Sequence, residues 1–175
     1  MSPDCYPFLF EGRPLKLIDL TQGKVALVDD EDYESLRVHK WYARRDTGGK
    51  VWYAVRKHRN DAGVQKDVLM HREILKSGTA SVDHRNGDGL DNRRENLRFA
   101  THSQNAANAR LQQRNTSGYK GVYWDKVKKK WIARVVHEGK YHYVGAFEDR
   151  ISASIARDKF AKQMFGEFAS LNKAA

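Results

Sequence analysis

Cysteine is almost absent from this chain of 175 residues, in which Cys5 is the only one. A single thiol forms no intrachain disulfide and no thiolate zinc cluster, so both kinds of stabilised fold are excluded. Long hydrophobic runs are missing as well, since no stretch approaches the roughly 18 apolar residues of a membrane-spanning helix. The N-terminal stretch MSPDCYPFLF has no basic segment ahead of its apolar residues, so we expect no signal peptide. The sequence predicts a cytoplasmic protein without membrane contact.

Negative charge is scarce relative to positive charge. The chain has 32 Lys and Arg against 22 Asp and Glu, which gives a net charge of +10 and a pI of about 9.7. More than half of this excess lies after residue 113. A surplus of this size favours a polyanionic partner, most often nucleic acid, although charge alone leaves a generically basic protein open. The length allows one medium domain or two small ones.

The first segment, residues 1–70, is expected to be rich in β-structure and to support the segment that follows. GKVALVDD alternates like a strand, and Asp29 or Asp30 is expected to cap a helix in EDYESLRVHKW. WYARR and VWYAVRKH flank DTGGK, which predicts a hairpin with Gly48 and Gly49 at its turn. KDVLMHREIL is expected to form a strand or a strand-to-helix junction.

The second segment, residues 71–113, is expected to contain two short strands and a helix around a polar loop. SVDH and LRFAT have the strand pattern, and RNGDGLDNRREN between them is rich in turn residues, with Gly87 and Gly89 expected to adopt positive φ. HSQNAANARLQQR favours a helix, with Thr101 or Ser103 as its N-cap. A loop of this length requires a functional reason, because apolar residues on both sides argue against disorder.

The third segment follows a linker at residues 114–118 and covers residues 119–172. YKGVYWD, KKWIARVVH and YHYVGAFE predict a three-stranded antiparallel meander. Asp149 is expected to cap a helix in RISASIARDKFAKQMFG, with a buried stripe formed by Ile151, Ile155, Phe160 and Phe165. The predicted fold class is therefore α+β, with a ββα unit after a β-rich extension and a three-stranded sheet packed on one helix at the end.

The stretch VDHRNGDGLDNRRENLRFATHSQNAAN resembles the HNH nuclease motif of the ββα-metal (His-Me finger) family in its homing-endonuclease form. LTQGKVALVDDEDYESL is similar to the N-terminal part of phage proteins of this type. The resemblance implies that Asp83 and Asn105 bind one divalent cation and that His84 is the general base. It also implies that Asn96 fixes the loop and orients the His84 ring through its carbonyl.

The chemistry of these residue types agrees with that assignment. A neutral imidazole with a pKa near 6.5 suits a general base at neutral pH. Asp83 directly precedes His84, so on an extended chain the two side chains point to opposite sides unless the strand twists there. The resemblance departs from the name-giving pattern at Asn105, where a His is usual; His102 and Asn108 are nearby alternatives for this position. One carboxylate and one amide fit Mg²⁺ or Mn²⁺ rather than tightly held zinc.

Four further residues near the motif carry expectations of their own. Arg93, Arg94 and Arg98 flank the loop and are expected to bind DNA phosphates, with a solvated surface as the alternative. His71 is expected to serve in packing or in contact with the DNA backbone, or to support the active site.

The segments SGYKGVYW, KKWIARV and VGAFEDRISASIARDKFAKQMFGEFASLN resemble the AP-two/ethylene-response-factor DNA-binding domain. The resemblance implies that the exposed face of the sheet enters the major groove. Alternation assigns Val122, Trp124, Trp131, Ala133, Val135 and Val144 to the core. Tyrosines and one arginine stand where the plant domains have several arginines and a tryptophan, so the target sequence does not carry over. The residues predicted to bind DNA here are Lys120, Tyr123, Lys126, Lys128, Lys129, Lys130, Arg134, Lys140, Tyr141 and Tyr143.

Together these features predict a metal-dependent, HNH homing-type endonuclease that cleaves double-stranded DNA at a preferred site. We expect a phage or mobile-element protein in the cytoplasm of a bacterial or phage-infected cell, acting as a monomer or weak dimer without a small-molecule cofactor. One metal site in a monomer predicts nicking of one strand. The alternatives are a catalytically inactive, sequence-specific DNA-binding regulator and a structural RNA-associated basic protein.

Overall fold

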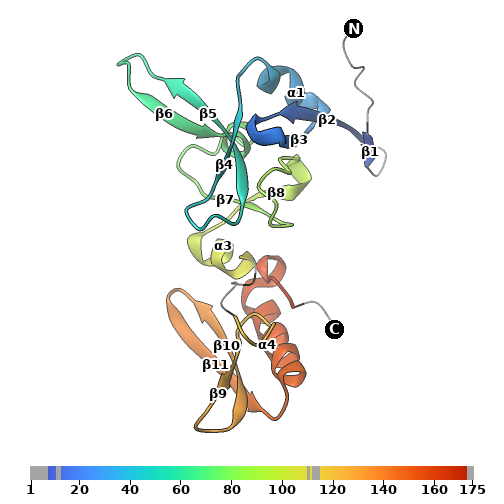
Figure 1. Ribbon diagram of the computed structural model, residues 1–175, viewed down its shortest axis with the longest axis vertical. Coiled ribbons are helices and arrows are strands. Elements are labelled where there is room, and N and C mark those ends of the chain that lie inside the picture. Colours follow the sequence, from blue (N-terminus) through green and yellow to red (C-terminus); the bar gives the residue numbers. More distant parts are fainter. Residues whose placement is uncertain (1–7, 11–12, 110, 112–114, 173–175) are drawn as a thin grey trace. The chain divides into compact units, whose positions relative to one another are not determined.

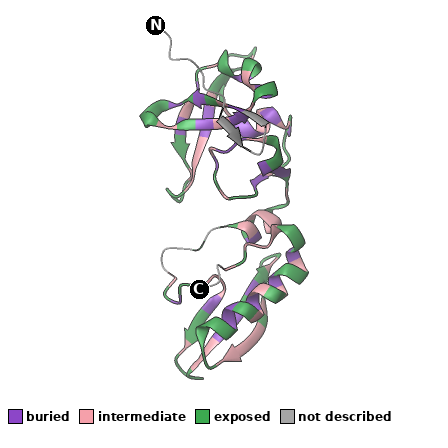
Figure 2. Cartoon of the chain, turned by 90° about the vertical axis from the view of Figure 1, so that its right-hand side faces the viewer, coloured by how far each residue is buried: buried purple, intermediate pink, exposed green. Residues whose placement is uncertain are grey.

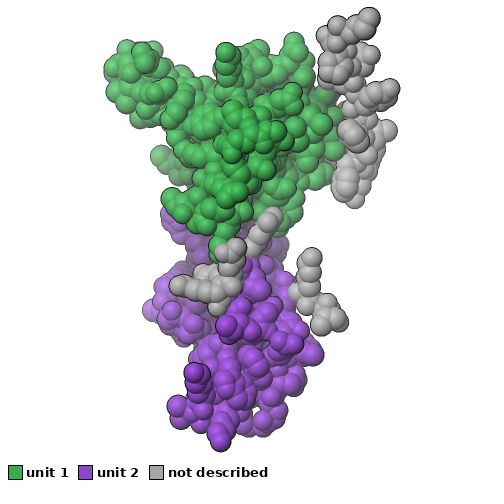
Figure 3. All heavy atoms as spheres, viewed as in Figure 1, with its two compact units in different colours: residues 1–99 green, residues 100–175 purple. Residues whose placement is uncertain are grey.

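The computed structural model describes residues 8–10, 13–109, 111 and 115–172. The chain divides into two compact units, residues 1–99 and residues 100–175 (Figure 3). Each unit has its own sheets and its own buried core. In the described part of the chain, no helix has the length and apolar character needed to cross a bilayer.

The first unit begins with two antiparallel three-stranded sheets and two short helices (Figure 1). The expected strand at GKVALVDD, the hairpin around DTGGK and the strand-to-helix junction before Ile74 are all confirmed. The acidic helix is present too, but it ends at Arg37 rather than continuing through HKW. The elements are β1 (Phe8–Phe10), β2 (Arg13–Asp19), the 3-10 turn η1 (Thr21–Gly23), β3 (Val25–Asp29), α1 (Asp30–Arg37), β4 (Tyr42–Arg45), β5 (Trp52–Arg59), β6 (Gln65–Leu69) and α2 (Met70–Ile74).

A two-stranded hairpin completes this unit. Strand β7 (Val82–His84) pairs antiparallel with β8 (Leu97–Phe99), and the 3-10 turn η2 (Arg94–Asn96) leads into β8. Helix α3 (His102–Asn108) follows in the chain and belongs to the second unit. The order β7, β8, α3 is consistent with a ββα-metal core. The expected helix was longer, and its residues 110 and 112–114 lie outside the described part.

The hairpin shares one hydrophobic core with the N-terminal segment. Leu97 of β8 is buried together with Val28, Trp41 and Met70. The loop between β7 and β8 also joins the edge of β3, because Leu27 donates its N–H to the Leu90 carbonyl at 2.9 Å and accepts from the Asn92 N–H at 2.8 Å. The segment from β3 to α2 and the hairpin therefore share one core.

The second unit has the antiparallel sheet and the single long helix that the sequence predicts. Asp149 caps this helix as expected, because its Oδ1 accepts from the N–H groups of Ile151 at 2.9 Å and Ser152 at 2.8 Å. The helix packs against all three strands. The elements are β9 (Val122–Asp125), β10 (Lys130–His137), β11 (Lys140–Phe147), α4 (Arg150–Phe165) and the 3-10 turn η3 (Gly166–Phe168), with strand order β11-β10-β9.

The predicted buried stripe of α4 was wrong at two positions. Ile151 and Ile155 are 50% and 64% exposed, whereas Ala153, Arg157 and Ala161 are buried (Figure 2). These three are spaced four residues apart and so form one helix face. Small alanines allow the helix to approach the sheet closely, and this contact rather than the isoleucines sets the helix rotation.

Trp124 was also wrongly placed in the core of the sheet. Val122, Ala133 and Val135 are buried as predicted, but Trp124 is 42% exposed. It lies near the hairpin end of β9, where its ring meets the Trp131 ring edge-on with centroids 5.2 Å apart. Alternation thus fails at the end of β9, and also at Ile132, which is buried next to Ala133.

Candidate active site

Asp83 lies on β7 directly opposite Arg98 on β8. The Arg98 Nε and Nη2 donate to Asp83 Oδ2 at 2.9 Å and 2.7 Å. Both residues are buried, with Arg98 only 7% exposed. A buried carboxylate with this partner is held in one orientation, because two donors on one guanidinium restrict its rotation.

His84 follows Asp83 and is enclosed by different neighbours. Its ring is 5% exposed; its centroid is 4.9 Å from that of His71 and 5.9 Å from that of Tyr53. The Asn92 Oδ1 lies 3.5 Å from His84 Nε2. Burial lowers the pKa of His84, against the opposing effects of Asn92 and of the Asp83 charge. The imidazole is therefore neutral at pH 7, which is the form that accepts a proton.

His71 on α2 forms one wall of this enclosure. Its ring stands perpendicular to the His84 ring, and its centroid lies 5.7 Å from that of Tyr53. Burial, with smaller contributions from the His84 and Arg72 charges, lowers the pKa of His71 to about 3. His71 is thus a buried neutral residue, as expected for packing or support of the site.

The His71→Phe protein is expected to lose less stability in acid than the parent. In the unfolded chain His71 becomes protonated below pH 6.5. In the folded chain it becomes protonated only near pH 3. His71 therefore makes the free energy of unfolding fall as pH falls through this window, by up to about 1.4 kcal/mol per pH unit. Urea unfolding between pH 7 and pH 4 measures the slope for each protein. Equal slopes would show that His71 takes up its proton in the folded state.

Asn96 fixes the loop between the two strands. Its Nδ2 donates to the Asp91 carbonyl at 2.7 Å, and its Oδ1 accepts from the Asn86 N–H at 3.0 Å. Its own carbonyl accepts from the Arg85 N–H at 2.9 Å. One side chain therefore holds two points of the loop that lie five residues apart. Orientation of the His84 ring by the Asn96 carbonyl stays a prediction.

The two loop glycines serve different purposes, which corrects the expectation of positive φ at both. Gly87 has φ 70°. Gly89 does not have positive φ, but a Cβ there would lie 2.4 Å from the Trp52 carbonyl and 2.6 Å from the Tyr53 ring. Gly89 is thus required by the close approach of the loop to β5.

The guanidinium groups of Arg93 and Arg94 are engaged by carboxylates. Arg93 Nη2 lies 2.7 Å from Asp91 Oδ2, and Arg94 Nη2 lies 2.6 Å from Asp32 Oδ1 on α1. Arg98 is held by Asp83, as described above. All three arginines thus contribute to the internal structure of the first unit, and their contact with phosphates stays a prediction.

Asn105 lies on α3 in the second unit. Its Oδ1 is buried and accepts no hydrogen bond from the described part of the chain. An unsatisfied buried amide oxygen costs free energy, and a cation is one partner that would satisfy it. An amide oxygen of this kind is a donor that a hard divalent ion accepts. Among the described residues no three His, Cys, Asp or Glu side chains cluster as a metal site. Asn105 as a ligand, like its alternatives His102 and Asn108, stays a prediction.

The sheet of the second unit exposes a cation held between aromatic rings. The Arg134 guanidinium lies 4.7 Å from the centroid of Tyr123 and 4.5 Å from that of Tyr141. Lys128 lies over Tyr143 at 5.6 Å, while Lys130 is paired with Glu148 at 2.6 Å. Tyr123, Tyr141 and Tyr143 are exposed, as the alternation predicts. The remaining predicted contacts, Lys126, Lys129 and Lys140, are exposed at or near the hairpin turns.

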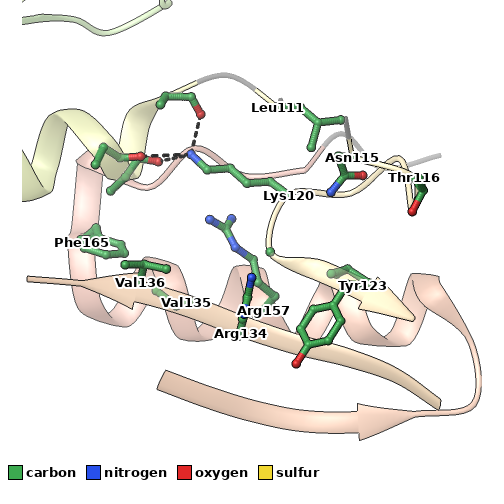
Figure 4. A pocket seen from close by; sticks show the side chains of 15 residues that line it. Leu111, Asn115, Thr116, Lys120, Tyr123, Arg134, Val135, Val136, Arg157 and Phe165 are labelled. Carbon is green, nitrogen blue, oxygen red and sulfur yellow. Dashed lines mark hydrogen bonds between the residues drawn. The ribbon is translucent and has the colours of Figure 1, made fainter. Parts of the chain in front are cut away.

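Lys120 has a different position from the other lysines. It lines a cavity of about 460 Å³ together with Arg134 and Arg157 (Figure 4). Its Nζ donates to the carbonyls of Ala107, at 2.6 Å, and Ala109 at the end of α3. Burial, with a contribution from Arg157, lowers the pKa of Lys120 to about 8. Lys120 thus caps α3 and anchors it in the second unit, and its contact with DNA stays a prediction.

Comparison with known proteins bears on the hairpin, its loop and α3. Residues 77–107 match the HNH endonuclease family. This match includes Asp83, His84, Asn96 and Asn105. The HNH assignment supports a nuclease. It ends before the C-terminal sheet, and the comparisons give no support to the resemblance of residues 119–172 to the ethylene-response-factor domain.

Two viral proteins are similar to this chain. Protein 3.8 of Escherichia phage T7 is 39% identical over 61 residues, which is 35% of this chain and half the length of that protein. A protein of Acanthamoeba polyphaga mimivirus described as an uncharacterized HNH endonuclease is 28% identical over 160 residues, which is 90% of this chain and 79% of that protein. No solved structure matches the chain.

Sequence reasoning missed the residues that enclose His84. Tyr53 lies on β5, 31 residues before His84, and Asn92 had been interpreted only as a turn residue. A local signal was Gly89, since a glycine in a polar loop indicates either positive φ or close approach by another segment. The sequence does not show which segment approaches Gly89, because that depends on the tertiary fold.

Proposed function

We propose that this protein is a metal-dependent endonuclease of the HNH type that hydrolyses phosphodiester bonds in double-stranded DNA. The observation that carries the proposal is the neutral, buried His84 next to Asp83, inside the segment that matches the HNH family. The net charge of +10 supports a polyanionic substrate. Homing activity and a preferred cleavage site rest on the sequence resemblance.

His84 acts as the general base in the proposed reaction. It accepts a proton from a water molecule whose oxygen forms the new bond to phosphorus, while the bond from phosphorus to the leaving sugar oxygen breaks. Tyr53, His71 and Asn92 enclose the ring and limit the positions it can adopt. A base that is fixed and neutral before substrate binds needs little reorganisation in the transition state.

Asp83 and Asn105 are the proposed ligands of one Mg²⁺ or Mn²⁺ ion. When bound, such an ion supplies positive charge to the scissile phosphate and to the leaving oxygen. Arg98 orients the Asp83 carboxylate through its two hydrogen bonds. Asn96 keeps the loop after His84 in shape through the Asn86 N–H and the Asp91 carbonyl.

The sheet of the second unit is proposed to hold the DNA while the HNH segment cleaves it. Arg134, held by Tyr123 and Tyr141, presents a positioned cation on an exposed sheet face, which fits a groove of duplex DNA. Lysines at the turns provide charge for neighbouring phosphates. This role is independent of the resemblance to plant domains.

Incubation with supercoiled plasmid tests the proposal. The parent protein is expected to nick or linearise the plasmid with Mg²⁺ or Mn²⁺ and to leave it intact with EDTA. The Asp83→Ala protein should bind the plasmid but leave it intact with either metal, whereas Asp61→Ala, at an exposed turn of the same unit, should cleave like the parent. Binding without cleavage by the parent under all these conditions would favour the DNA-binding regulator instead.

A further inference from the structure

Trp52 on β5 has two cations over its ring. The Lys24 Nζ and the Arg45 guanidinium carbon each lie 4.6 Å from the ring centroid. Attraction to the electron-rich face of the ring explains why each cation is there, but the two positive charges repel each other. Two like charges over one ring indicate that contacts other than those with the ring hold Lys24 and Arg45 in place.

The protein holds these two cations together through specific contacts. Arg45 and Trp52 are cross-strand partners in the β4–β5 hairpin. Lys24 follows the turn η1, which is tied to β4 by two hydrogen bonds: Gln22 Nε2 donates to the Ala43 carbonyl, and the Ala43 N–H donates to Thr21 Oγ1, both at 3.1 Å. Gln22 adopts φ 63°, an uncommon conformation for a residue with a side chain. The turn that delivers Lys24 is therefore built against β4.

Neither cation has a carboxylate partner in the described part of the chain, in contrast to its neighbours. Arg44, next to Arg45, pairs with Asp67, and so does Lys57 on the same hairpin. Arg56 pairs with Glu73. Carboxylates on β6 and α2 thus neutralise several neighbouring cations, while Lys24 and Arg45 are available to an external anion.

The pair lies in the same unit as His84, over Trp52 of the strand that also carries Tyr53. Tyr53, whose ring is 5.9 Å from that of His84, is the next residue after Trp52 on β5, so the two side chains point to opposite faces of the hairpin. A cavity of about 270 Å³ is lined by Arg45, Tyr53 and His71 among others. An anion at Lys24 and Arg45 would therefore be held on the same strand as Tyr53, but from its opposite face.

We propose that Lys24 and Arg45, held on Trp52, form a binding site for backbone phosphates of duplex DNA in the first unit. The site places a second DNA contact in the cleaving unit itself, separate from the sheet of the second unit. Phosphate is the fitting ligand because it accepts hydrogen bonds from both cations and carries the charge that the pair lacks. This inference rests on the proposed function.

The salt dependence of DNA binding tests the site. With a defined duplex in EDTA, the logarithm of the binding constant falls linearly with the logarithm of salt concentration, with a slope that loses about 0.9 for each phosphate contact removed. The Lys24→Gln/Arg45→Gln protein is expected to show a slope smaller by about 1.8 than the parent. The single variants should each lose about half of that, and Lys24→Arg/Arg45→Lys should keep the parental slope.

Arg37→Gln is the matched control. Arg37 also lies over an aromatic ring, that of Tyr33 at 5.8 Å, but it is paired with Glu34 at 2.9 Å. Its loss should leave the slope unchanged. Thermal unfolding of every variant shows whether it is folded, and the charge-conserving double variant separates loss of charge from loss of structure.

The outcomes separate this proposal from the proposed function. If the parent binds and cleaves duplex DNA while the Lys24→Gln/Arg45→Gln protein keeps the parental slope, the phosphate site is overturned and the nuclease stands. An equal decrease in slope with Arg37→Gln would overturn it too, because the effect would then be one of net charge. If the parent neither binds nor cleaves the duplex, the proposed function fails first.

Discussion

The His84→Ala protein is expected to cleave DNA about 10²–10⁴-fold more slowly than the parent, the range for loss of a general base. Its affinity for duplex DNA should remain unchanged, because the ring is buried and contributes no charge at neutral pH. Single-turnover cleavage at saturating protein separates the chemical step from binding.

Two controls separate loss of the general base from loss of structure. His58→Ala removes an exposed imidazole from β5 in the same unit and should cleave like the parent. Thermal unfolding of the His84→Ala protein shows whether the enclosure by Tyr53 and His71 survives without the ring. A folded His84→Ala protein that cleaves at the parental rate would remove His84 as the base and would leave the water activated by another group.

The Arg98→Met protein is expected to be less stable than the parent by about 3–5 kcal/mol in EDTA, since the change removes one partner of a buried ion pair. The carboxylate of Asp83 then remains buried without its guanidinium. A divalent cation bound by Asp83 would compensate part of that charge. Mn²⁺ should therefore raise the unfolding midpoint of this variant more than that of the parent.

A double variant tests whether charge is the cause. In Asp83→Asn/Arg98→Met both charges are gone, so the loss of unfolding free energy in EDTA should be smaller than in Arg98→Met alone. This double variant should also lose the response to Mn²⁺. Urea unfolding of the parent, both single variants and the double variant completes the cycle. Equal stability of Arg98→Met and the double variant would mean that Asp83 carries no charge in the folded protein.

Local patterns predicted most elements of the fold. Alternation in GKVALVDD, the glycines in DTGGK and the cap at Asp149 each depend on a few adjacent residues, and each element is present. Which face of α4 is buried depends on its contact with the sheet. This contact buries Ala153 and Ala161 rather than the larger isoleucines. Hydrophobicity alone therefore gave the wrong face.

The candidate site was only partly predictable for the same reason. Asp83, His84 and Asn96 stand at fixed spacing in one segment, so the motif singles them out, and they lie within the residues that match the HNH family. The contact of Arg98 with phosphate stays a prediction, whereas its pairing with Asp83 was not foreseen, because it depends on the strand register that places the two side chains opposite each other. Tyr53 contacts His84 through tertiary packing, and no fixed spacing in the sequence predicts this contact.

The most direct test of the central claim is an order-of-addition measurement on the parent protein. Protein and supercoiled plasmid are first combined in EDTA, binding is verified by gel retardation, and Mg²⁺ is then added in excess. Our account predicts bound, intact plasmid before the addition and nicked or linear plasmid after it. Cleavage before Mg²⁺ is added, or plasmid that stays bound and intact afterwards with Mg²⁺ and with Mn²⁺, would contradict it.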